Sequence, residues 1–247
     1  MIKKNLKHLE KNGFLKTTVL NNKEIKLIFD EIKKIYSFEG QDKSLDEYIK
    51  NLYKIDNIHA GKCYDMLNQS ALVQRIFLSD KVLNKIAFYL QMKSRSLITF
   101  ADFQFLVMLP NKKKEQLGWH QDSKYFEFTK NKRSSLILWT SLRVTGKKVT
   151  SSLMLMPGSH NEGRIDHHQN HSKKIKKSSR AKRGKYFINK EKLKKFKPKT
   201  FFINSGQSLL LDSNMVHRSG PSLKNNESIR YTIVARYKSI NKILNIS

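Results

Sequence analysis

A change in hydrophobic periodicity near residue 95 constrains the fold more than any other feature of this 247-residue chain. Before it, apolar residues recur at helical spacing and predict, among others, a helix that begins near Asn21 or Asn22 and ends at about Tyr36. After it, short apolar runs over 97–109, 135–144, 149–156 and 207–212 are separated by turn signals and predict strands. A mainly helical N-terminal third of the chain followed by several short strands predicts an α+β fold with a sandwich or jelly-roll core.

The length suits one domain with a sizeable core. We expect a single domain over 1–247 that is mainly helical over 1–95, forms the core strands over 96–160 and 200–240, and carries an insertion at 161–199. The only cysteine, Cys63, excludes an intramolecular disulfide and fits a reducing, cytoplasmic location. The N-terminus does not have the pattern of a signal peptide, and no apolar run approaches the roughly 20 residues that span a bilayer.

The formal net charge of +29 suggests a nucleic-acid or membrane-surface role. Lysine outnumbers arginine 39 to 10, however, whereas proteins that read DNA rely on the planar guanidinium of arginine. We therefore interpret most of the charge as a solvated surface. The charge is densest in the insertion, where residues 164–199 contain fifteen Lys or Arg and two acidic residues. We expect this segment to be partly helical over 190–196 and otherwise mobile.

The pair His120-x-Asp122 is the strongest candidate for chemistry. In an extended strand, side chains two residues apart point to the same face, so both could bind one ion. An imidazole and a carboxylate are two members of the 2-His-1-carboxylate triad, which leaves positions on Fe(II) open for cosubstrate and O₂. His160-Asn161-Glu162 is a second match to the same pattern. The cluster His167-His168-Gln169-Asn170-His171 could also bind a metal, although a solvated loop is the favoured interpretation.

A third ligand and an anion anchor are predicted near the C-terminus. His217 follows the predicted strand 207–212 and precedes a Gly-Pro turn, and an antiparallel sandwich could bring it back to His120. On the next strand Arg230 shares a face with Thr232 and Val234, and an inward arginine there could pair with a dicarboxylate. Arg236 is on the same face and is expected to matter little. Asp102 and Gln104 share one face of strand 97–109, either as a cavity wall or as satisfied core groups.

Five motifs together resemble the phytanoyl-CoA dioxygenase family of Fe(II)/2-oxoglutarate-dependent oxygenases. They occur in order along the chain: Trp119-His120-Gln121-Asp122-Ser123, Leu138-Trp139-Thr140-Ser141-Leu142, Met156-Pro157-Gly158-Ser159-His160, His217-Arg218-Ser219-Gly220-Pro221, and Arg230. The opening Asn12-Gly13-Phe14 before a helix is also similar to the start of the family. The chain departs from the family near Arg143, where an acidic residue is usual, and in a longer spacing between His217 and Arg230.

The resemblance implies a double-stranded β-helix in which His120, Asp122 and His217 hold iron. It further implies that Arg230 pairs with the distal carboxylate of 2-oxoglutarate, with Ser219 assisting and Trp139 lining the pocket, and we assign Gln104 to the same pocket. In such folds the 161–199 connection lies near the mouth of the active site, so its charge could select anionic substrates; a solubilising loop is the alternative.

These features predict a cytoplasmic dioxygenase that uses Fe(II), 2-oxoglutarate and O₂. It would hydroxylate a C–H bond of a small, anionic metabolite or conjugate while 2-oxoglutarate is decarboxylated to succinate. Asp122 favours hydroxylation over halogenation, because related halogenases lack the carboxylate ligand. The alternative is a basic protein that binds nucleic acid or an anionic surface on an inactive oxygenase scaffold.

Overall fold

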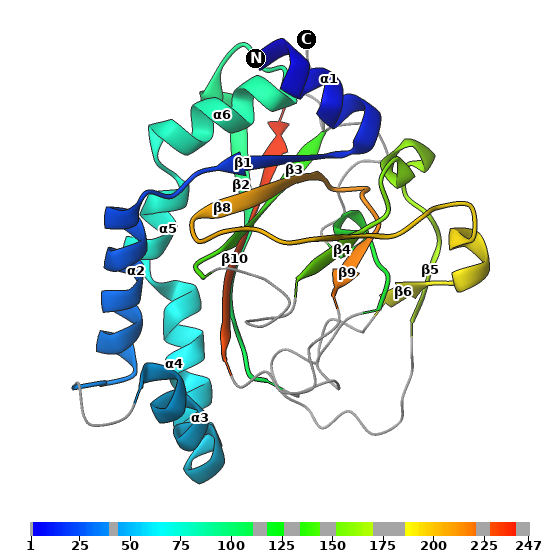
Figure 1. The fold of residues 1–247 in the computed structure, drawn as a ribbon. Coiled ribbons are helices and arrows are strands. Elements are labelled where there is room, and N and C mark those ends of the chain that lie inside the picture. Colours follow the sequence, from blue (N-terminus) through cyan, green and yellow to red (C-terminus); the bar gives the residue numbers. More distant parts are fainter. Residues whose placement is uncertain are drawn as a thin grey trace.

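The computed structural model describes residues 2–39, 44–110, 118–125, 134–143, 152–169, 186–220 and 228–240. Within these ranges the strands form three antiparallel sheets: a five-stranded sheet in the order β1-β8-β3-β10-β2, a three-stranded sheet in the order β7-β4-β9, and the pair β5-β6. Most helices lie on one side of the five-stranded sheet, the first and sixth helices lie at the top of the view, and the two smaller sheets lie on the other side (Figure 1). The predicted combination of helices and antiparallel strands is confirmed.

The first ninety residues contain six α-helices in the described part of the chain: α1 (Ile2–Asn12), α2 (Asn22–Ile35), α3 (Leu45–Ile55), α4 (Asn57–Gln69), α5 (Ala71–Phe77) and α6 (Asp80–Leu90). Two of them begin with a capping box, in which the N-cap side chain and the Glu at the third helical position satisfy free backbone N–H groups. The N-cap is Asn21 for α2 and Ser44 for α3. The predicted helix ending near Tyr36 is therefore confirmed as α2.

The strands of the five-stranded sheet are β1 (Phe14–Thr18), β2 (Ile98–Met108), β3 (Ser135–Ser141), β8 (Gln207–Asp212) and β10 (Arg230–Ser239). Those of the smaller sheets are β4 (Leu153–Leu155), β7 (Lys199–Phe201), β9 (His217–Ser219), β5 (His167–Gln169) and β6 (Tyr186–Ile188). The strands predicted over 97–109, 135–144, 149–156 and 207–212 are all present, with shorter bounds for β3 and β4. The strand β8 agrees with its predicted range.

The five-stranded sheet has a different apolar cluster on each face. The helices cover its outer face, where Leu136, Leu138, Ala235 and Tyr237 join the core of the helical layer. The inner face faces the three-stranded sheet and packs through Trp139, Val234, Leu153 and Leu155, among others. Because residues along a strand alternate between faces, Val234 on the inner face places Arg230, Thr232 and Arg236 on that face too. The space between the two sheets is therefore where the candidate residues of β10 point.

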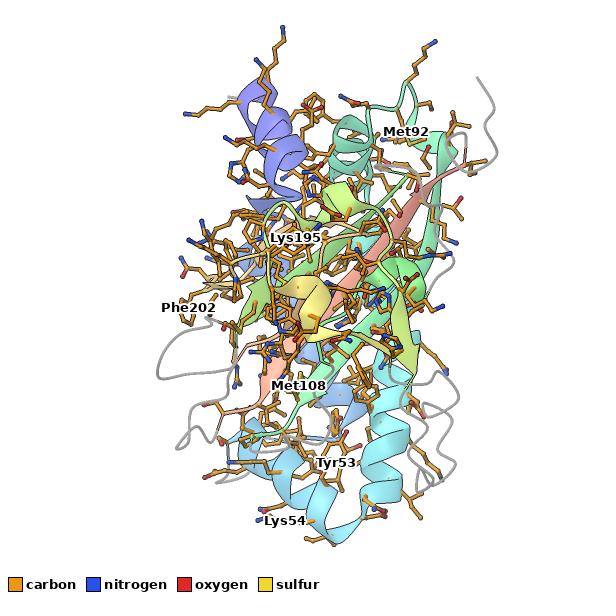
Figure 2. All side chains as sticks on the ribbon, turned by 90° about the vertical axis from the view of Figure 1, so that its right-hand side faces the viewer. Tyr53, Lys54, Met92, Met108, Lys195 and Phe202 are labelled. Atoms are coloured by element: carbon orange, nitrogen blue, oxygen red, sulfur yellow. The ribbon has the colours of Figure 1, made fainter. Side chains whose placement is uncertain are left out.

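In the described parts of the basic segment 161–199, the predicted helical structure near 190–196 is confirmed, and short strands are present that the sequence did not predict. The segment contributes β5, β6 and the 3₁₀ helix η5 (Lys190–Leu193), and these pack through Ile188 and Leu193 against Val216. Two ion pairs lie on the surface of the segment, one between Lys195 and Glu162 (2.8 Å) and one between Lys192 and Asp166 (2.8 Å). Figure 2 looks onto this side of the molecule, with Lys195 labelled. Residues 170–185, which include the predicted His171, lie outside the described ranges. No helix in those ranges is long and apolar enough to cross a membrane.

Candidate metal centre

A short antiparallel contact brings His120 and His217 together. The amide of His120 donates to the His217 carbonyl (3.1 Å), and the amide of His217 donates to the His120 carbonyl (3.0 Å). His217 is the first residue of β9, whereas Asp122 begins the 3₁₀ turn η3 (Asp122–Lys124). The prediction that His120 and Asp122 share one face of a strand is wrong in its geometry. The turn nonetheless directs the carboxylate to the two imidazoles.

The three side chains form one buried group that could hold a metal ion. Oδ1 of Asp122 lies 3.6 Å from Nε2 of His120 and 3.7 Å from Nε2 of His217. The potential ligand atoms all lie within 4.8 Å of one another, and no other such His, Cys, Asp or Glu group is found in the described residues. Two imidazoles and one carboxylate oxygen are the donor set of a facial triad.

Backbone carbonyls fix the tautomer of both histidines. Nδ1 of His120 lies 2.8 Å from the Gly118 carbonyl, and Nδ1 of His217 lies 2.9 Å from the Met215 carbonyl. A carbonyl only accepts, so both Nδ1 atoms donate, and a neutral ring then has its lone pair on Nε2. Burial, followed by the nearby His120, lowers the pKa of His217 to about 4. His217 is therefore neutral at physiological pH and directs a free lone pair at the centre of the group.

Arg236 holds the other oxygen of Asp122. Its Nε donates to Oδ2 of Asp122 (2.6 Å), and a second guanidinium nitrogen donates to Oδ2 of Asp102 (2.8 Å). Burial alone would raise the pKa of Asp122, but Arg236 and the two histidines outweigh it and hold that pKa well below its usual range. With Oδ2 engaged, Asp122 presents only Oδ1 to an ion. Arg236, expected from the sequence to matter little to the cosubstrate, thus contacts a candidate metal ligand, and Asp102 is a satisfied polar group on the inner face.

Charge-preserving replacement of this arginine tests the contact. Arg236→Lys keeps the positive charge, but a single ammonium group cannot reproduce the planar fork that spans Asp122 and Asp102. Groups that orient a metal ligand typically contribute about 10- to 100-fold to metal affinity. We therefore expect Mn²⁺ binding, followed by the electron paramagnetic resonance signal of the free ion, to weaken at least about tenfold. Unchanged Mn²⁺ affinity in a folded Arg236→Lys protein would show that the fork does not orient the ligand.

Gln121 connects the segment between His120 and Asp122 to other parts of the chain through hydrogen bonds. Its side-chain amide donates to the carbonyls of Gly163 (2.8 Å) and Asn214 (2.6 Å) and accepts from the amide of Ile165 (2.8 Å). Its backbone amide donates to Nε2 of His167 (3.0 Å). Burial is the main cause that lowers the pKa of His167 to about 4, so this ring is neutral and can accept. The predicted histidine cluster thus supplies a structural contact through His167, and neither His167 nor the exposed His168 belongs to the metal-ligand group.

The second His-x-acid match does not form a site. Nε2 of His160 donates to the carbonyl of Glu10 (3.0 Å), and Glu162 pairs with Lys195 on the surface. A Cβ added at Gly13 would come within 2.4 Å of the His160 ring, so the glycine allows α1 to pack on this turn. The Pro-Gly-Ser-His motif therefore ties the N-terminal segment to the end of β4.

The predicted anion anchor lies at the start of β10. Guanidinium nitrogens of Arg230 approach the hydroxyl of Ser219 (3.4 Å) and the carbonyl of Ser152 (3.4 Å), and they contact the sulfur of Met108. The Arg230 guanidinium carbon lies 5.8 Å from the centre of the Trp139 ring. Burial lowers the pKa of Arg230 to about 10, which still leaves it charged at neutral pH. The structure thus brings Arg230, Ser219 and Trp139 together.

The anchor and the histidines face the same interior space. Ser219 follows His217 by two residues on β9, so their side chains share a face. Gln104 pairs in register with Val234 and is on the inner face of β2. The hydroxyl of Thr232 is buried without a hydrogen-bond partner in the described structure. A buried cation and a hydroxyl that lacks a partner fit a carboxylate-bearing ligand between Arg230 and the metal group.

Solved structures with the same fold include non-haem, alpha ketoglutarate-dependent enzymes. The epimerase SnoN of nogalamycin biosynthesis, solved with Fe³⁺, alpha ketoglutarate and nogalamycin RO, is 13% identical at a TM-score of 0.63, over 96% of this chain and 83% of its own. EvdO2 from Micromonospora carbonacea var. aurantiaca, solved with 2-oxoglutarate, is 15% identical at a TM-score of 0.61, over 96% and 90% of the two chains. The alpha ketoglutarate-dependent carbocyclase SnoK is 13% identical at a TM-score of 0.64, over 96% and 83%.

The sequence itself identifies the family. Residues 9–226 match the phytanoyl-CoA dioxygenase family, and the chain belongs to that family. No curated protein matches the sequence. The resemblance noted in the motifs is therefore confirmed, and the solved neighbours indicate a cupin-like fold.

Proposed function

We propose that this protein is an Fe(II)/2-oxoglutarate-dependent dioxygenase. The observation that carries the proposal is the buried His120–Asp122–His217 group, whose two imidazoles direct Nε2 toward a single carboxylate oxygen. Membership of the phytanoyl-CoA dioxygenase family and the ligands of the solved neighbours support it. In this proposal the five- and three-stranded sheets form a double-stranded β-helix within a single domain, and the protein is cytoplasmic.

Each part of the site has a distinct task. His120, Asp122 and His217 would hold Fe(II), and the contact from Arg236 leaves Asp122 one oxygen, Oδ1, to offer the ion. Arg230 and Ser219 bind the distal carboxylate of 2-oxoglutarate, while Trp139 and Gln104 line the pocket. When bound, Fe(II) with 2-oxoglutarate and O₂ supplies C–H oxidation, with succinate and CO₂ as coproducts. The apolar residues around Leu155 and Val234 exclude water from this space.

Spectroscopy of the anaerobic protein tests this proposal directly. Chelation of Fe(II) by the keto acid end of 2-oxoglutarate produces visible charge-transfer absorption, which we expect on adding both to the protein. An inactive oxygenase scaffold that binds nucleic acid or an anionic surface, the alternative, would give no such band. The complete ligand group and the buried Arg230 favour the enzyme over that alternative.

We further propose that the substrate is a small, anionic metabolite or conjugate and that the reaction is hydroxylation. The support is the charge of residues 164–199, whose described part packs beside the Trp119–Gln121 segment through Ile188 and His167. Electrostatic steering acts on association and weakens with salt, because the Debye length falls from about 10 Å at 0.1 M to about 3 Å at 1 M. We expect kcat/KM for such a substrate to fall with added salt while kcat changes little. A kcat/KM that does not depend on salt would contradict the proposal of an anionic substrate but not the proposal of an oxygenase.

A further inference from the structure

Three hydrogen-bond donors converge on the carboxylate of Asp46, the second residue of α3. A guanidinium nitrogen of Arg143 donates to Oδ2 (2.7 Å), and the backbone amide of Ile229 donates to the same oxygen (2.9 Å). The hydroxyl of Tyr231 donates to Oδ1 (2.9 Å). Asp46 is buried, with 9% of its surface exposed. One side chain of the helical layer thus holds the residues on both sides of Arg230.

These contacts lie at the end of β10 where its pairing with the neighbouring strands stops. Pairing between β10 and β3 begins only at Thr232, opposite Ser141, with one further bond from the Leu142 amide to the Tyr231 carbonyl (3.1 Å). On the other side, Arg230 opposite Met108 is the last pair with β2. At Arg230, therefore, β10 has left β3. The next amide toward the N-terminus, that of Ile229, donates to the carboxylate of Asp46 instead of to a neighbouring strand.

The charge of Asp46 is compensated within the same cluster. The Arg143 guanidinium lies 4.8 Å from the Tyr231 ring centre and 5.3 Å from that of Phe29, so the cation is held between α2 and β10. Burial, followed by the charge of Asp46, raises the pKa of Tyr231, and its hydroxyl therefore remains a donor. A buried carboxylate with a cation and two further donors is well satisfied, whereas removing it would leave the amide of the fully buried Ile229 without this acceptor.

We infer that Asp46 is a positioning residue for Arg230. It fixes the backbone at Ile229 and Tyr231 from the helical layer and so holds the guanidinium against Ser219 and Trp139. The inference rests on the proposed function, in which Arg230 binds the distal carboxylate of 2-oxoglutarate. In this inference α3 affects the cosubstrate affinity through the backbone on both sides of Arg230, and no residue of α3 needs to touch the cosubstrate.

Calorimetric titration of 2-oxoglutarate into the Mn²⁺-substituted protein tests this role without turnover. We expect Asp46→Ala to raise the 2-oxoglutarate Kd about tenfold, as expected when one hydrogen bond to a charged group is weakened. The Mn²⁺ Kd should stay unchanged, and in the Fe(II) enzyme KM for 2-oxoglutarate should rise while kcat does not. Ser70→Ala is the matched control, because it removes the buried N-cap of α5 and its bond to Glu31 without touching β10. It should lower the unfolding temperature and leave the 2-oxoglutarate Kd as in the wild type.

Amide hydrogen exchange of the ligand-free protein supplies an independent readout. The Ile229 amide should lose protection in Asp46→Ala and keep it in Ser70→Ala. If Asp46→Ala does not fold, Asp46→Asn keeps the shape and one oxygen but loses the charge that pairs with Arg143, and a smaller rise in the 2-oxoglutarate Kd is expected. A folded Asp46→Ala protein with the wild-type Kd or a protected Ile229 amide, or, where only Asp46→Asn folds, the wild-type Kd in that variant, would overturn the inference alone. A wild-type protein that binds no 2-oxoglutarate would overturn the proposed function, and the role of Asp46 with it.

Discussion

Replacing His217 by alanine is expected to abolish turnover and to weaken metal binding by at least about 100-fold. Structural zinc sites with four ligands bind with about 10–16 kcal/mol, so one ligand contributes roughly 3 kcal/mol, on the order of 100-fold in affinity. In this protein the loss also breaks the convergence of Nε2 atoms on Oδ1 of Asp122. Titration with Mn²⁺ and an assay of succinate production would measure both effects. Alanine at His120 or Asp122 should behave similarly.

His168→Ala is the matched control for the metal experiment. This histidine is exposed on β5, pairs with Phe187 through the backbone, and lies outside the ligand group. We expect wild-type Mn²⁺ affinity and activity. If His168→Ala lost metal while His217→Ala kept normal affinity and turnover, the triad would be the wrong group and the histidines of the basic segment would replace it.

Replacing Arg230 by alanine is expected to raise the 2-oxoglutarate requirement by roughly 30- to several-thousand-fold. Losing one partner of a buried, hydrogen-bonded charge pair costs about 2–5 kcal/mol, and every 1.4 kcal/mol is about tenfold in affinity. Arg230 is almost fully buried, with 3% of its surface exposed, so solvent cannot replace it. The KM for 2-oxoglutarate and the Kd of the Mn²⁺-substituted protein would both report the change, whereas Mn²⁺ affinity should stay near the wild-type value.

Arg218→Ala controls for the loss of a nearby arginine. Arg218 lies on β9 between His217 and Ser219, so its side chain is on the opposite face, where its guanidinium carbon is 4.6 Å from the Trp119 ring centre. We expect its 2-oxoglutarate affinity to remain close to wild type. An Arg218→Ala protein with the larger penalty would place the anchor on the outer side of the small sheet and contradict the assignment of Arg230.

The elements and site residues that could be predicted are those with local sequence signals. The apolar spacing of Ile25, Ile28 and Ile32 is enough to define α2, and β8 is bounded by Gly206 and the turn at Ser213. His217 could be found because it follows a strand and precedes a Gly-Pro turn, and the order of motifs indicated the family. Apart from the order of the motifs, each of these signals occurs within a window of about ten residues, where periodicity and turn chemistry determine the structure.

The contacts that support the site were missed because they join distant parts of the chain. Arg236 and Asp122 are 114 residues apart, and Asp46 and Ile229 are 183 residues apart. The pairing of Arg236 with Asp102 could be predicted only if the register of β10 against β2 were known, because the two residues then stand opposite one another on the inner face. The turn at Asp122 was missed for a different reason: a His-x-Asp motif is compatible with either a strand or a turn, and the packing of Gln121 decides between them.

The strand β10 sets a fixed distance between Arg230, the proposed cosubstrate anchor, and Arg236, which contacts the candidate metal ligand Asp122. Six residues separate Arg230 from Arg236, and a rise of about 3.3–3.4 Å per residue places their Cα atoms roughly 20 Å apart. Inserting one residue between them would turn one arginine toward the helical layer, because a single step exchanges the faces of a strand. Inserting two would restore the face but lengthen the separation by about 7 Å. Length variation among relatives that keep this chemistry is therefore expected before Arg230 or after Arg236, and chimeric proteins should exchange β10 only as a whole.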